Sequence, residues 1–195
     1  TIYLNHFIKY VKEGIFKGLN NAKLKGYGAE QKFYSGIPEI FKTTSELLNN
    51  DPLCKEYNIC VEHYIVSTGF AEVIRGTSIM QYVKDIWGCE LIEHTVDDDI
   101  KEIAEIGYTI DNTTKTRAIF EINKGEGVDV NAKIAYEQRR VDFKNMIYIA
   151  DGPSDVPAFS VIKSKGGATF AIYPKRNERA FKQVEKLRED GRIDM

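Results

Sequence analysis

Residues 146–155, Met-Ile-Tyr-Ile-Ala-Asp-Gly-Pro-Ser-Asp, decide the fold prediction. A short apolar run ends on Asp151, and a tight turn that carries a second carboxylate, Asp155, follows it. Apolar runs of this length that end in turn residues are typical of a buried strand in a parallel sheet. We expect Gly152 to let the turn close sharply, because glycine tolerates backbone angles that other residues avoid.

The two aspartates of this turn also predict a metal site. Carboxylate oxygens on one loop at the carboxyl end of a strand suit a hard cation such as Mg²⁺. The alternative interpretation is structural: Asp151 occupies a turn, and Asp155 or Ser154 caps the helix that follows. Pro157, in the first turn of that helix, is compatible with both interpretations.

Strands and helices alternate on both sides of this stretch. The decisive stretch contributes an expected strand at residues 145–150. The other expected strands are residues 63–67, 91–93 and 168–173. The expected helices are residues 70–87, residues 117–123 and a charged helix from residue 175 onward, with a small hairpin around Gly107 at 103–111. This alternation predicts an α/β fold, a parallel sheet with helices on its faces.

The first part of the chain has a different texture. Apolar residues recur every three or four positions from residue 2 to residue 19, as an amphipathic helix requires. A second helical block runs from about Pro38 to the turn at 49–52. The change of texture predicts two domains, an α-helical region at 1–58 and an α/β region at 59–195.

A second apolar run, Tyr-Ile-Val-Ser-Thr-Gly-Phe at 64–70, ends in hydroxyl residues and a glycine before an expected helix. Ligands of open parallel sheets sit at the carboxyl ends of strands, where helix N-termini present N–H groups to anions. Ser67 could therefore hold a phosphate oxygen. The alternative is that Ser67 or Thr68 only caps the helix.

Lys115 lies at the start of a helical run upstream of the decisive strand. A lysine at this place could neutralise phosphate charge. The chain is rich in lysine, so a solvated surface position is the alternative, and Lys124 competes with Lys115 for the phosphate role.

Composition and charge exclude several classes of function. The 195 residues carry 27 Lys and Arg against 29 Asp and Glu, so nucleic acid is not an expected partner. No apolar run approaches the ~20 residues that span a bilayer, so a membrane is not expected either. Three cysteines, Cys54, Cys60 and Cys89, form no CxxC pair, which favours a reducing cytoplasm over a disulfide framework.

Taken together and in this order, these residues resemble the haloacid dehalogenase superfamily, most closely its phosphoserine-phosphatase-like branch. The strand that ends at Ser67 resembles the second motif of the family, and Lys115 resembles the third. Residues 151–155, Asp-Gly-Pro-Ser-Asp, resemble the fourth, although Ala150 stands where glycine is usual. The resemblance implies a Rossmann-like parallel sheet with helices on both faces and a small helical cap formed by residues 1–58.

The same resemblance implies an activity. The protein would hydrolyse a small phosphorylated metabolite through an aspartyl-phosphate intermediate, with Mg²⁺ as cofactor. Ser67 and Lys115 would hold the phosphoryl oxygens, and Asp151 and Asp155 would serve the metal. One alternative is a non-catalytic scaffold of the same fold that binds phosphate or metal without turnover. Another is a plain structural α/β domain.

The first motif of the family, an apolar strand ending in Asp-x-Asp-x-Thr or Val, has no counterpart here. The nearest strings, at 129–131 and 97–99, do not follow apolar strands. We therefore expect the nucleophilic aspartate upstream of Thr1, and expect these residues alone to be inactive. In the family that strand lies between the Ser67 strand and the Asp151 strand. Both should lack a ladder partner unless an upstream segment or a swapped neighbour supplies one.

Overall fold

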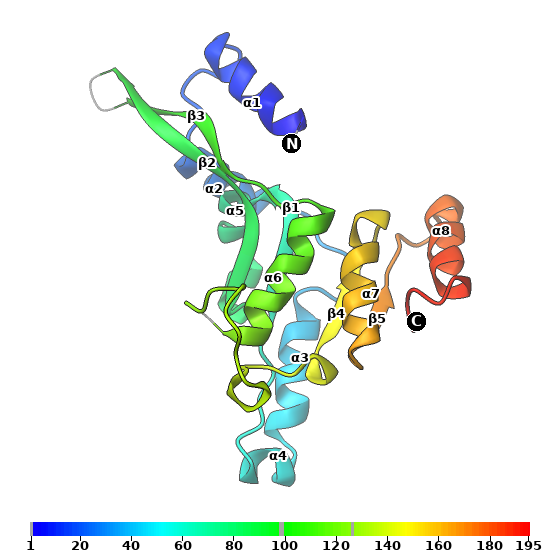
Figure 1. The fold of residues 1–195 in the computed structure, drawn as a ribbon. Coiled ribbons are helices and arrows are strands. Elements are labelled where there is room, and N and C mark those ends of the chain that lie inside the picture. Colours follow the sequence, from blue (N-terminus) through cyan, green and yellow to red (C-terminus); the bar gives the residue numbers. More distant parts are fainter. Residues whose placement is uncertain (1, 98–99, 126) are drawn as a thin grey trace. The chain divides into compact units, whose positions relative to one another are not determined.

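The computed structural model describes residues 2–97, 100–125 and 127–195 (Figure 1). The chain divides into two compact units, residues 1–110 and residues 111–195. The first contains a three-stranded sheet and the second a two-stranded sheet, each with helices, so the predicted α/β class is confirmed, although the sheet of the first unit is mixed rather than parallel. In the part of the chain described, no helix combines the length and apolar character needed to cross a membrane.

The first unit begins with helices. They are α1 (Ile2–Lys12), α2 (Asn21–Gly26), the 3₁₀ helix η1 (Tyr27–Glu30), α3 (Glu39–Asn49) and α4 (Pro52–Glu56). The helix predicted over 2–19 ends early, because Gly14 and Gly18 adopt positive φ angles of 75° and 73° that a helix cannot contain. The second predicted helical block is confirmed as α3, and Asp51 caps α4 by accepting the backbone N–H groups of Leu53 and Cys54.

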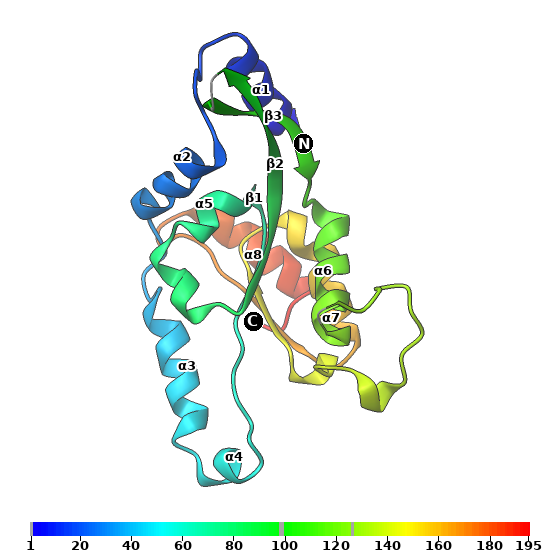
Figure 2. The ribbon, with the colours of Figure 1, turned by 90° about the vertical axis from the view of Figure 1, so that its left-hand side faces the viewer.

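The strands of the first unit form a mixed sheet. They are β1 (Tyr64–Phe70), β2 (Asp85–Asp97) and β3 (Ile100–Tyr108), in the order β1-β2-β3, with α5 (Ala71–Arg75) and the 3₁₀ helix η2 (Ser78–Tyr82) between β1 and β2. β1 pairs with β2 in parallel, and β3 pairs with β2 antiparallel. Figure 2 shows β2 running on beyond β1 to pair with β3 near α1.

Two predictions for this region are wrong. The helix predicted over 70–87 stops at Arg75, and Trp87 lies in β2, where the chain alternates between exposed and buried positions as a half-buried strand does. The small hairpin predicted around Gly107 is part of β3, which pairs antiparallel with β2; Asp98 and Asp99 are outside the described residues. Gly107 makes room for a cross-strand neighbour instead, since a Cβ there would lie 3.1 Å from Ile92 Cγ1.

One hydrophobic core holds the helices and strands of the first unit together. α1 and α2 contribute Leu4, Ile8, Val11 and Leu24 to it, and Leu19 comes from the connection between them. From the strands and the end of the unit come Cys89, Leu91, Ile103 and Ile110. The compact units thus divide after residue 110 rather than at the change of texture near residue 58, and the assignment of 1–58 as a cap stays a prediction.

The second unit follows the predicted elements closely. It contains α6 (Asn112–Lys124), η3 (Tyr136–Gln138), η4 (Phe143–Asn145), β4 (Ile147–Ala150), η5 (Pro153–Asp155), α7 (Val156–Ser164), β5 (Ala168–Ala171) and α8 (Glu178–Glu189). β4 and β5 pair in parallel, with Ile147 opposite Ala168. The two predicted strands, the predicted helix at 117–123 and the charged C-terminal helix are confirmed.

The two faces of β4 differ in burial. Tyr148 and Ala150 pack toward the core that contains the fully buried Phe159 of α7. Ile147 and Ile149 point the other way and are 66% and 47% exposed. Successive side chains of a strand alternate between faces, so within this unit one face of the small sheet is covered and the other is open.

Candidate functional site

Lys115 is fixed at the start of α6 by a well-formed helix cap. The Asp111 side chain accepts the backbone N–H groups of Thr113 and Thr114, both at 2.8 Å, and Thr114 Oγ1 accepts the backbone N–H of Asp111 at 2.6 Å. This reciprocal arrangement is a capping box, and it sets the first turn of the helix that carries Lys115. Lys115 is only 6% exposed, so the surface interpretation of this lysine is wrong.

The ammonium group of Lys115 meets the carboxylate of Asp155. Lys115 Nζ lies 2.6 Å from Asp155 Oδ1, although the two residues are 40 positions apart in the sequence. Asp155 is 2% exposed. It occupies the N-cap position of α7, yet within the described part of the chain its carboxylate caps no backbone N–H group. The interpretation of Asp155 as a helix cap is therefore wrong.

Two further groups complete the hydrogen bonding of Asp155. The Tyr148 hydroxyl donates to Oδ1 at 2.6 Å, and the Ser154 hydroxyl donates to Oδ2 at 3.2 Å. Lys115 Nζ also lies 3.5 Å from Ser154 Oγ. Burial, reinforced by the Asp155 carboxylate, raises the pKa of Tyr148 far above its ordinary value, so the phenol keeps its proton and acts as a donor.

Asp151 follows β4 directly and is exposed. It lies at the carboxyl end of the strand, as predicted, and the 3₁₀ helix η5 leads from its turn to Asp155. The explanation predicted for Gly152 is wrong. Its φ of −148° is extended backbone that any residue adopts, and a Cβ there would meet only Asp155 Oδ2 and Ser154 Oγ, both at 3.9 Å.

The two aspartates differ as potential metal ligands. The exposed carboxylate at the strand end, Asp151, has the oxygen chemistry that Mg²⁺ takes. The carboxylate of Asp155 already receives three hydrogen bonds, so it fits a supporting position better than direct coordination. Among the residues whose placement is described, no three His, Cys, Asp or Glu side chains gather in a group that could hold a metal ion.

Ser67 belongs to the first unit, and its surroundings are described there. Its Oγ accepts the backbone N–H of Gly69 at 3.0 Å, within a stretch where the β1–β2 register shifts between Val66 and Phe70. The N-cap of α5 is Phe70, and no side-chain cap is found at this helix among the described residues. The interpretation of Ser67 or Thr68 as a helix cap is therefore wrong. α5 has only five residues, so it offers a weaker dipole than the predicted long helix.

The irregular part of β1 after Ser67 is tied to the core of the first unit through Thr68. Its carbonyl oxygen accepts a hydrogen bond from the Tyr3 hydroxyl of α1 and lies 3.2 Å from Cys89 Sγ. Burial, with the neighbouring Cys89 thiol, raises the pKa of Tyr3 above its ordinary value. The Tyr3 hydroxyl is therefore a permanent donor that helps to hold this part of β1.

The two competing lysines have different partners. Lys124 Nζ donates to the backbone carbonyl oxygens of Val130 and, at 2.6 Å, Ala132. It thus closes the loop that follows α6, whereas Lys115 contacts Asp155. Tyr148 was missed by the sequence reasoning. The signal for it was a phenol within the otherwise aliphatic run Ile147–Ala150, since a buried hydroxyl needs a partner.

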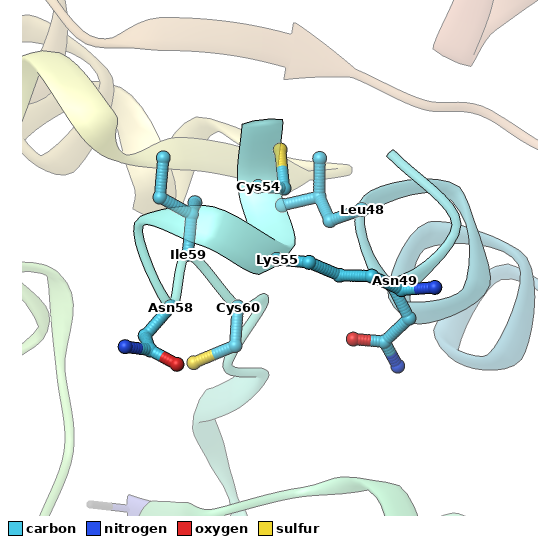
Figure 3. A pocket seen from close by; sticks show the side chains of 7 residues that line it. All are labelled: Leu48, Asn49, Cys54, Lys55, Asn58, Ile59 and Cys60. Carbon is cyan, nitrogen blue, oxygen red and sulfur yellow. The ribbon is translucent and has the colours of Figure 1, made fainter. Parts of the chain in front are cut away.

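A separate cavity of about 280 Å³ lies by α3 and α4 (Figure 3). It is lined by Leu48, Asn49, Cys54, Lys55, Asn58, Ile59 and Cys60. Figure 3 shows the side chains of Cys54 and Cys60 pointing in different directions, and both are free thiols. Burial, followed by the Asp51 carboxylate, raises the pKa of Cys54, which keeps the thiol protonated and weakly nucleophilic.

Comparison with known proteins finds a relative in Borreliella burgdorferi. An uncharacterized protein of Borreliella burgdorferi is 39% identical over 173 residues, which are 84% of this chain and 60% of the relative. The chain thus spans about 60% of the length of the protein it matches. No family model matches the chain. No solved structure matches it either.

Proposed function

We propose that these residues form part of a haloacid-dehalogenase-like phosphohydrolase that hydrolyses phosphomonoesters through an aspartyl-phosphate intermediate. The observation that carries the proposal is the contact between Lys115 and Asp155, the residues expected from the third and fourth motifs of that family. A buried ion pair contributes little net stability, because the loss of hydration offsets the attraction between the charges. Its presence in the core of a small unit therefore favours a functional role.

Each residue has a role in this proposal. An ammonium group has three N–H donors. Among the described residues the partners of Lys115 are Asp155 and Ser154, which leaves a donor for a phosphoryl oxygen. Ser67 would hold another phosphoryl oxygen from within β1, directly after its regular pairing with β2 ends at Val66. Asp151 would bind Mg²⁺ directly and Asp155 would support it; when bound, Mg²⁺ offsets the repulsion between a carboxylate nucleophile and the phosphate dianion.

The two sheets support a Rossmann-like core. β1 stands at one end of the order β1-β2-β3, and β4 stands at one end of the order β4-β5, so in the described residues both are edge strands. In the family that these residues resemble, a strand with the nucleophilic aspartate lies beside the counterparts of both. The Borreliella burgdorferi relative extends beyond the matched part, which leaves room for such a strand in that protein. A small phosphorylated metabolite as substrate and a cytoplasmic location belong to the same proposal.

The test uses the full-length protein with para-nitrophenyl phosphate, a general phosphomonoester. We expect hydrolysis that requires Mg²⁺ and that falls roughly a hundredfold or more in Asp151→Asn, since the metal that stabilises the transition-state charge loses a carboxylate ligand. Asp129→Asn is the matched control: Asp129 is also an exposed turn aspartate, which accepts the backbone N–H of Asn131 at 2.9 Å.

The outcomes separate the candidate functions. Full activity in Asp151→Asn would refute the metal assignment. Binding of orthophosphate and Mg²⁺ by the full-length protein without turnover of any phosphomonoester would favour the non-catalytic scaffold. Absence of both binding and turnover would leave a structural α/β domain.

A further inference from the structure

Tyr148 and Lys115 share one oxygen atom of Asp155. The Tyr148 hydroxyl and the Lys115 ammonium group each lie 2.6 Å from Asp155 Oδ1. The three residues come from β4, α6 and the 3₁₀ helix η5 before α7. Oδ2 has the longer contact, 3.2 Å to the adjacent Ser154, so the strong contacts of this carboxylate converge on Oδ1.

We propose that Tyr148 is a positioning residue for Lys115, acting through Asp155. The inference rests on the proposed function, in which Lys115 holds a phosphoryl oxygen. A lysine side chain has four rotatable bonds, and one hydrogen bond to a carboxylate that can itself rotate does not fix its ammonium group. With the phenol bound to the same oxygen, rotation of the carboxylate breaks two short hydrogen bonds instead of one.

The hydroxyl of Tyr148 is the part of the side chain that needs this explanation. The ring packs edge-on against Phe159, with centroids 5.4 Å apart and planes at 86°, a contact that phenylalanine would also make. A buried hydroxyl without a partner is unfavourable, so phenylalanine would be the simpler residue for packing alone. The hydroxyl donates to Asp155, whose other close partner is Lys115.

The phenol also suits a fixed support. A phenol has a single O–H donor, and in Tyr148 it is directed at Asp155 Oδ1 at 2.6 Å. The hydroxyl thus holds the acceptor of the Lys115 ammonium group in one place.

The experiment compares Tyr148→Phe with the full-length wild-type protein. Lysine ammonium groups that are buried and hydrogen-bonded exchange slowly with water and are visible by ¹H–¹⁵N NMR; the Lys115 signal is assigned by its loss in Lys115→Met. We expect exchange of this ammonium group to accelerate about tenfold in Tyr148→Phe, as the loss of a hydrogen bond to a charged group implies. Tyr64→Phe is the matched control, since Tyr64 also donates to a carboxylate, Glu62 Oε2, at 2.6 Å.

The result that overturns the inference is an unchanged Lys115 exchange rate in Tyr148→Phe, or an equal acceleration in Tyr64→Phe. If Tyr148→Phe does not fold, Tyr148→Leu, which removes the same hydroxyl, is measured with the same expectation. The measurement needs no turnover, so failure of the phosphatase assay and failure of the positioning role are distinguishable. In an active enzyme, Tyr148→Phe should also lower kcat/KM about tenfold while the remaining amide spectrum stays as in the wild type.

Discussion

Replacing Lys115 by methionine removes the charge from the buried pair and keeps an unbranched side chain in its place. Asp155 then remains 2% exposed, with its carboxylate in the core of the second unit. Removing one partner of a buried ion pair costs about 3–5 kcal/mol, because the other charge is left without compensation. Tyr148 and Ser154 still donate to Asp155, so we expect the lower end, about 3 kcal/mol.

Urea unfolding of the full-length protein, followed by circular dichroism, measures this loss. With a denaturant dependence of about 2 kcal/mol per molar, the midpoint should fall by about 1.5 M. Asp155→Asn keeps an oxygen that can accept the hydrogen bond from Tyr148. The double variant, Lys115→Met with Asp155→Asn, contains no buried charge at this place. The double variant should therefore be more stable than the sum of the single changes predicts, by about 2 kcal/mol.

Additivity of the two changes to within about 0.5 kcal/mol would refute the reasoning, since it would mean that the two groups do not interact in solution. Lys186→Met provides the control. Lys186 forms a pair of similar length with Asp190, at 2.8 Å, but the two side chains are 69% and 45% exposed. Water screens such a pair, so the midpoint should stay close to that of the wild type.

Two further predictions concern stability alone. Asp111→Ala should destabilise the protein by about 1 kcal/mol at pH 7 through loss of the α6 cap. The hydrogen bond from the Thr114 N–H is the main cause of the lowered pKa of Asp111. The stabilisation is therefore fully present above the ordinary pKa of 3.8 and is lost as the pH falls through the lowered pKa. The urea midpoints of the variant and the wild type should converge at that low pH. Gly76→Ala should cost about 2 kcal/mol or more in thermal unfolding, because a Cβ would overlap the Lys25 carbonyl oxygen, whereas Gly26→Ala, with nothing within 4 Å of its Cβ, should cost nothing.

The sequence was sufficient where the local pattern alone determines the structure. The apolar run at 147–150 between turn residues became β4, and the helical spacing at 117–123 became part of α6. It was misleading at residues 70–87. Apolar residues recur there at helical intervals, yet the stretch contains a short helix and the start of β2. The helix ends at Arg75, and the next residue, Gly76, packs against the backbone at Lys25, a contact between segments about fifty positions apart that local spacing does not encode.

The candidate site shows the same limit. Sequence order placed Lys115, Asp151 and Asp155 in one site as predictions, but the burial of the lysine and its contact with Asp155 depend on the packing of α6 against α7. The hydrogen bond from Tyr148 to Asp155 depends on which face of β4 is buried. These are properties of packed elements, and single-residue chemistry could only suggest them.

In the part of the chain that the structure describes, one edge of β4 has no ladder partner, which affects how these residues behave in concentrated solution. Backbone N–H and C=O groups along that edge lie beside the exposed Ile147 and Ile149. A strand of a second molecule can pair with β4 there and extend the sheet. Concentrated samples of the segment should therefore tend toward fibrillar association through β4. A lysine in place of Ile149 would discourage it, because a charge on the exposed face of an edge strand blocks the approach of an identical strand.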